Sequence, residues 1–224
     1  MEENSLSLSF SKSISDEMSG IVSEYTELGL DALLEDGVLK DIPIVSTAVS
    51  IYKIGKSFRE KYHISKLVSF LDEINKGICD EVKRQEYQDK FYANEKFRNQ
   101  ELEYILVLID RYISMDKPRM LAKLYLAYLN GEMDWLEFTK YAEIVDRFLP
   151  GDKESLIREQ ALYHEIHVPI PDAFLRLASF GIYEEYMTDI IAPTTIGSIT
   201  IPAKQEKTFK TTEFGEKLII ILGE

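Results

Sequence analysis

The spacing of apolar residues between residues 18 and 150 is the strongest constraint on the fold. Apolar side chains recur there every three or four positions in successive segments, which is the spacing of one face of an α-helix. Pro43 and Pro118 fall near predicted helix starts, and Gly131 and Gly151 follow predicted helix ends. The pattern predicts a helical bundle over residues 18–150, within a mainly α-helical chain.

The two ends of the chain have a different pattern. Residues 1–17 are rich in serine and contain only isolated apolar residues, so we predict a flexible N-terminal tail. The last third combines helical spacing with alternating apolar and polar residues, which indicates a small α+β domain over residues 153–224. Its predicted elements are a short helix, two short strands and a terminal helix, at residues 173–180, 198–201, 207–210 and 212–222.

Composition limits the classes of function. The chain has 224 residues, a formal net charge of −13, one cysteine and three histidines. A single cysteine excludes an intramolecular disulfide and favours a reducing, cytoplasmic location. The N-terminus lacks the basic and apolar regions of a signal peptide. The longest nearly uncharged apolar stretch, residues 42–52, is much shorter than the roughly 20 residues of a transmembrane helix, so we expect no span.

The sequence contains no pattern typical of a catalytic or cofactor-binding site. His164 and His167 are three residues apart, but no third ligand accompanies them, so we expect no metal site. Glycine-rich phosphate loops, dinucleotide fingerprints and nucleophile elbows are absent from the sequence. We therefore expect a non-enzymatic protein that needs no cofactor.

The C-terminal third resembles a winged-helix domain. The residues that carry the resemblance are Leu175-x-x-x-Ser179-Phe180-Gly181-Ile182, a predicted strand pair, and Thr212-x-Phe214-Gly215-x-x-Leu218. In winged-helix domains the third helix ends in a glycine and an apolar residue. Two strands then form the wing, and a Thr-x-x-Gly helix often follows. The resemblance implies that residues 153–224 form a winged-helix-like domain.

The first two thirds resemble uncharacterised bacterial families of mobile-element and phage-defence loci. The similar segments are Asp41–Gly55, Lys66–Leu71 and Ala127–Phe138. The resemblance implies a setting in the conflict between bacteria and phages, and it implies no chemistry.

These features favour an interaction or regulatory subunit that binds another protein. The helix before Gly181 is apolar, and an exposed apolar face is usually a contact surface. We predict that Phe174, Leu177 and Phe180 make this contact, with the alternative that they fill the core of the domain itself. A homo-oligomer is a further alternative.

A DNA-binding winged-helix regulator is the second hypothesis. DNA-binding versions of the domain present basic and amide side chains to the major groove and to phosphates. The candidate residues here are Arg176, Lys204, Lys207 and Lys210. The acidic chain would repel a nucleic-acid backbone, so we do not favour a nucleic-acid partner.

A membrane-associated effector is the third hypothesis. Residues 42–66 combine an apolar run with five basic residues and one acidic residue, a net charge of +4 that suits an interfacial helix. The candidate residues are Lys53, Lys56, Arg59 and Lys61. A buried bundle helix with a basic, solvated end explains the same pattern, and we favour that interpretation over a membrane surface.

Overall fold

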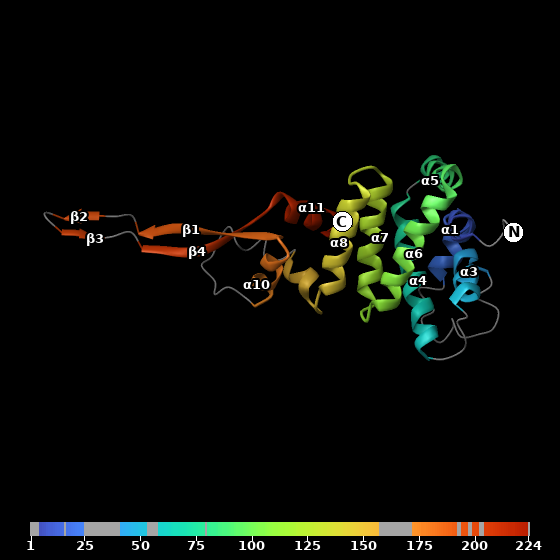
Figure 1. The fold of residues 1–224 in the computed structure, drawn as a ribbon, viewed down its shortest axis with the longest axis horizontal. Coiled ribbons are helices and arrows are strands. Elements are labelled where there is room, and N and C mark those ends of the chain that lie inside the picture. Colours follow the sequence, from blue (N-terminus) through green and yellow to red (C-terminus); the bar gives the residue numbers. More distant parts are fainter. Residues whose placement is uncertain are drawn as a thin grey trace. The chain divides into compact units, whose positions relative to one another are not determined.

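The structure, a computed structural model, is mainly helical, with short antiparallel strands near the C-terminus (Figure 1). The chain divides into two compact units, Met1–Arg147 and Phe148–Glu224. The predicted boundary, between residues 150 and 153, falls a few residues beyond this division. The structure describes residues 5–15, 17–24, 41–52, 58–78, 80–156, 172–191, 194–196, 199–201 and 204–223.

The N-terminal unit is a helical bundle. Its helices are α1 (Leu6–Ser13), α3 (Pro43–Tyr52), α4 (Phe58–Gly77), α5 (Glu81–Ala93), α6 (Glu95–Arg111), α7 (Asp116–Leu129) and α8 (Trp135–Arg147). Residues 17–24 are also helical. In Figure 1, α8 and α7 lie at one end of the bundle, α4 and α6 in its middle, and α1, α3 and α5 at the other end.

Aromatic side chains run through the core of the bundle. The ring centroid of Phe10 lies 5.0 Å from that of Phe91 and 6.2 Å from that of Tyr125. The ring of Tyr125 lies 5.8 Å from that of Phe138 in an edge-on arrangement. All four side chains are fully buried, so they link α1, α5, α7 and α8 in one continuous core.

Helix α1 contradicts the prediction of a flexible tail over residues 1–17. Leu6, Phe10 and Ile14 are spaced four residues apart and are at most 4% exposed, so one face of α1 is part of the core. The prediction failed because serine fills the positions between them. Serine is small enough to let neighbouring helices approach α1 closely.

Two of the buried serines of α1, Ser9 and Ser13, have hydrogen-bond partners on the neighbouring helix α3. The Ser13 hydroxyl accepts from the backbone N–H of Ile44 at 3.0 Å, in the first turn of α3. The hydroxyls of Ser9 and Thr47 are 2.7 Å apart. The Arg84 guanidinium donates to the carbonyl of Ile14 at 3.0 Å, beyond the last turn of α1. Because these groups are paired, burying them carries a small cost.

Local sequence signals set most helix ends. Pro43 begins α3, as predicted. The Asp134 carboxylate accepts from the backbone N–H of Glu137 at 2.7 Å and caps α8, and Gly131 has a φ of +79° after α7. α4 runs without a break through residues 61–65, and Asn94 lies between α5 and α6.

In the part of the C-terminal unit that the structure describes, helices flank two antiparallel pairs of strands, which we together call the hairpin. Its described elements are α10 (Asp172–Ser179), β1 (Tyr183–Ile191), β2 (Thr194–Ile196), β3 (Ile199–Ile201), β4 (Lys204–Thr211) and α11 (Glu213–Gly223). β1 pairs with β4 and β2 pairs with β3, both antiparallel. A short helical segment, residues 152–156, begins the unit.

The strand pairing differs from the prediction. We expected residues 198–201 and 207–210 to form the two strands, whereas β3 pairs with β2 and β4 pairs with β1. Glu184, Glu185 and Asp189 broke the apolar alternation that would have revealed β1. The predicted terminal helix is confirmed as α11.

Candidate functional site

The hairpin is attached to α11 through a close backbone contact. The Thr212 hydroxyl donates to the carbonyl of Gly181 at 2.6 Å and accepts from the backbone N–H of Gly215 at 3.0 Å, which caps α11. A Cβ at Gly215 would lie 2.1 Å from the carbonyl oxygen of Ile182. This contact explains the Thr-x-Phe-Gly pattern, because only glycine fits where α11 crosses Ile182.

One face of the hairpin base belongs to the core of the C-terminal unit. Tyr183 and Phe209 are 4% and 3% exposed, and the β1–β4 register places them on the same face. Ile182 and Leu218 are fully buried as well. The first residues of the hairpin are therefore fixed by packing.

The structure describes two of the three side chains that were predicted to contact a partner. Leu177 is only 1% exposed, so it is a core residue and its proposed role in contacting a partner is wrong. Phe180 is half-buried, and its backbone N–H closes the turn after α10 by donating to the Leu177 carbonyl. The side chain of Phe174 lies outside the described part of the chain.

Arg176 forms a partly buried ion pair with Asp152. Its guanidinium binds the Asp152 carboxylate through two nitrogens, with Nε 3.3 Å from Oδ2 and Nη2 on Oδ1. Asp152 is 1% exposed and also accepts from the backbone N–H of Leu149 at 2.7 Å. The guanidinium therefore holds α10 to the segment around Asp152, which argues against a role in reading DNA.

The wing lysines also give little support to DNA binding. Lys210 lies opposite Glu184 in the β1–β4 ladder, and its amine is 2.6 Å from the Glu184 carboxylate. Exposed acids nearby include Glu185 and Glu213. The side chains of Lys204 and Lys207 lie outside the described residues.

The described apolar residues at the start of the segment proposed to contact a membrane lie inside the bundle. Ile42, Ile44, Val45 and Ala48 are at most 1% exposed, so this apolar surface is not available to lipid in the folded state. No helix of the described residues is long and apolar enough to cross a membrane.

The basic end of the same segment is only partly described. Arg59 is exposed, with its guanidinium 3.6 Å from the Asp110 carboxylate, and Lys61 is half-buried. Lys53 and Lys56 lie outside the described residues.

A polar cluster joins α4 to the end of α6. The buried Lys66 amine donates to the carbonyls of Asp110 and Tyr112 at 2.9 and 2.7 Å, where helix α6 leaves carbonyls unpaired. His63 Nδ1 lies 3.4 Å from the Asp110 carboxylate. Burial lowers the pKa of His63 from its ordinary 6.5, and the Asp110 charge opposes this shift. These contacts hold α4 against the C-terminal end of α6.

A second cluster connects α6, α7 and α8. The Tyr128 hydroxyl and the Arg98 guanidinium both donate to Glu101, which is 1% exposed. The Tyr104 hydroxyl donates to Glu143 at 3.3 Å. Burial, together with these carboxylates, raises the pKa of Tyr104 and of Tyr128 to about 12.

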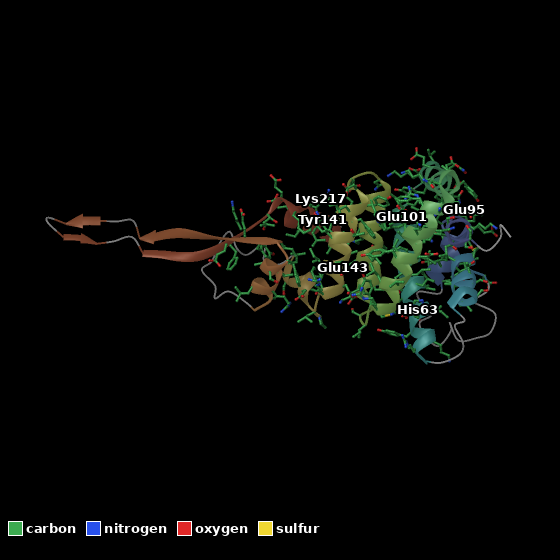
Figure 2. All side chains as sticks on the ribbon, in the orientation of Figure 1. His63, Glu95, Glu101, Tyr141, Glu143 and Lys217 are labelled. Atoms are coloured by element: carbon green, nitrogen blue, oxygen red, sulfur yellow. The ribbon has the colours of Figure 1, made fainter. Side chains whose placement is uncertain are left out.

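The polar side chains of the bundle are spread over several helices. Figure 2 shows His63 on α4, Glu101 on α6 and Glu143 on α8 at separate places in the bundle. Within the described ranges, no group of three or more histidine, cysteine or acidic residues could hold a metal ion. His164 and His167 lie outside these ranges.

The distal part of the hairpin is the remaining candidate site. In Figure 1, β2 and β3 lie beyond the ends of β1 and β4, away from α10 and α11. Each of the two short strands makes its main contacts with the other. Sequence reasoning missed this site because it did not predict β2, although one signal was present: residues 190–203 contain no charged side chain.

No protein-family model, curated protein or solved structure matches the chain. The function must therefore be argued from the residues and contacts described above.

Proposed function

We propose that the chain is a non-enzymatic interaction or regulatory subunit that binds protein through the hairpin of its C-terminal unit. The observation that carries the proposal is the β2–β3 ribbon, whose strands pair with one another beyond the packed base. A two-stranded ribbon is at best marginally stable in water, so a partner that covers it would stabilise it. Exposed strands and their side chains are also a common means of recognising proteins.

The charges of the C-terminal unit favour this hypothesis over DNA binding. Arg176 and Lys210 are engaged with Asp152 and Glu184, and the chain as a whole carries a charge of −13. The proposed setting in bacteria–phage conflict rests on the resemblance of the first two thirds alone. The winged-helix-like character of the C-terminal unit is likewise a proposal, supported by the order of α10, hairpin and α11.

Affinity purification of the tagged full-length chain from its source cells tests the proposal. The matched control replaces residues 192–203 with Asn-Gly, a two-residue turn that suits a tight hairpin and follows the last β1–β4 pair, Ile191 and Lys204. We expect a stoichiometric protein partner with the wild-type chain and none with the control. Mass spectrometry and the ultraviolet absorbance ratio identify what co-elutes. Nucleic acid without a protein partner, or a partner that the control retains, would contradict the proposal.

A further inference from the structure

Four side chains of helix α4 contact the C-terminal end of helix α6 and the residues that follow it. They are Arg59, Tyr62, His63 and Lys66, the i, i+3, i+4 and i+7 positions of one helix face. The Lys66 amine donates to the carbonyls of Asp110 and Tyr112. The Tyr62 hydroxyl donates to the carbonyl of Ile113 at 2.6 Å. Among these four residue types only histidine has an ordinary pKa between pH 5 and 8, so His63 is the group that mild acid charges.

The surroundings of His63 suit a neutral imidazole. Its side chain is 9% exposed, and its Nδ1 atom is buried without a hydrogen-bond partner. The acidic group beside it is the Asp110 carboxylate, at 3.4 Å, which is 49% exposed and also lies 3.6 Å from the Arg59 guanidinium. A carboxylate that water screens and a second cation shares compensates the burial of an imidazolium poorly.

The charges around His63 also favour its neutral form. Burial lowers the pKa of the imidazole from the ordinary 6.5, and the attraction of Asp110 opposes this only in part. The positive charges of Lys66 and Arg59 lower the pKa further. Protonation of His63 would place a third cation beside these two, and the two carbonyls that bind the Lys66 amine keep it from moving away.

The helices that pack on α4 bring no other described charge against His63. Helix α3 contains no charged residue. On α6, Arg111 pairs with Asp146. The charged residues of α7 are Asp116, Lys117, Arg119 and Lys123. Its two lysines contact the Asp146 carbonyl and the Glu73 carboxylate, and its other two charged side chains are exposed. The response of His63 to acid is therefore set by Asp110 and by the two neighbouring cations of α4.

We infer that His63 makes the contact between α4 and the end of α6 sensitive to acid, so that protonation of its imidazole loosens the connection from α6 to α7. A charged imidazole regains its water when the first half of α4 separates from residues 110–113. This separation breaks the hydrogen bonds of Tyr62 and Lys66. Because folding lowers the pKa of His63, its contribution to stability is complete above about pH 6.5 and is lost as the pH falls below this value. The inference concerns the bundle and is independent of protein binding by the hairpin.

An NMR titration of the full-length chain tests the charge state of His63. The variant His164→Gln with His167→Gln keeps a single histidine, so its ring signal belongs to His63. We expect a titration midpoint below 6.5, and a lower midpoint still when Asp110→Asn is added, because this change removes the attraction of the carboxylate. A midpoint at or above 6.5 would overturn the inference, since acid would then strengthen the contact.

Hydrogen–deuterium exchange of the full-length chain tests the loosening itself. Rates are measured by mass spectrometry at about pH 7.5 and 5.5 and divided by the intrinsic rate at each pH. We expect the amides of residues 58–66 and 108–115 to lose protection at the lower pH in wild type and in the single-histidine variant. They should keep it in His63→Gln, whose side chain stays neutral. Equal losses with and without His63 would overturn the inference, and circular dichroism confirms that each variant remains helical.

Discussion

At the scale of single residues, Gly215 tests how the hairpin is attached to α11. The Gly215→Ala substitution would place a Cβ 2.1 Å from the backbone oxygen of Ile182, and backbone cannot move aside as a flexible side chain can. We expect a loss of about 1–3 kcal/mol in the free energy of unfolding of the C-terminal unit, measured by urea denaturation followed by circular dichroism.

Gly223→Ala is the control for this prediction in the same helix. A Cβ at Gly223 would meet no heavy atom within 4 Å, so the substitution should leave the free energy of unfolding nearly unchanged. Equal effects of the two substitutions would contradict the role of the Ile182 contact.

Arg176 distinguishes an architectural role from a DNA-reading role. Arg176→Ala would leave the Asp152 carboxylate, 1% exposed, without its charged partner. Breaking a fully buried pair costs about 3–5 kcal/mol, and we expect roughly 2 kcal/mol because the Arg176 side chain is 30% exposed. Chemical denaturation of Arg176→Ala, Asp152→Asn and the double variant should give a coupling energy above about 1 kcal/mol. An unchanged stability with a lower affinity for DNA would instead support the DNA-binding hypothesis.

At the scale of elements, α1 is the helix whose role differs most from the sequence-based prediction. Phe10 is 1% exposed and contacts the rings of Phe70, Phe91 and Tyr125. Phe10→Ala should lower the free energy of unfolding by about 3–5 kcal/mol, measured by chemical denaturation, because it leaves a cavity among these rings.

Lys12→Ala is the matched control in α1, since Lys12 is the exposed residue of this buried helix. We expect it to change the free energy of unfolding by less than about 0.5 kcal/mol. If α1 were a flexible tail, both substitutions would be neutral.

The bundle helices were predictable where strong local signals mark their ends. The signals are local: the backbone geometry of Pro43 and Gly131, and the capping of the next turn by Asp134. The sequence alone is therefore sufficient to predict these helix ends. The boundary at Asn94 is not marked in the sequence, because its side chain makes no capping hydrogen bond and the charged pattern continues across it. Helix α1 was missed because the sequence does not show that a buried serine such as Ser9 is satisfied by a group far away in the chain, here Thr47.

The candidate site was less predictable than the fold. Leu177 was expected to contact a partner and proved to be core, because an apolar helix face looks the same whether it meets its own domain or another protein. The β2–β3 ribbon depends on the pairing of Ile196 with Ile199 and of Thr194 with Ile201. Apolar content alone does not set this register, so the ribbon could not be predicted from it.

At the scale of the whole molecule, the division between Arg147 and Phe148 predicts that the bundle folds without the C-terminal unit. The packed rings of Phe10, Tyr125 and Phe138 all belong to residues before this point. A fragment of residues 1–147 should therefore unfold cooperatively on heating when followed by circular dichroism at 222 nm. A fragment that ends at Asn130 is the control, because it lacks α8 and with it the buried side chains of Tyr141 and Val145. That shorter fragment should lose its cooperative transition, whereas a broad, non-cooperative transition in the longer one would show that the bundle needs residues beyond 147.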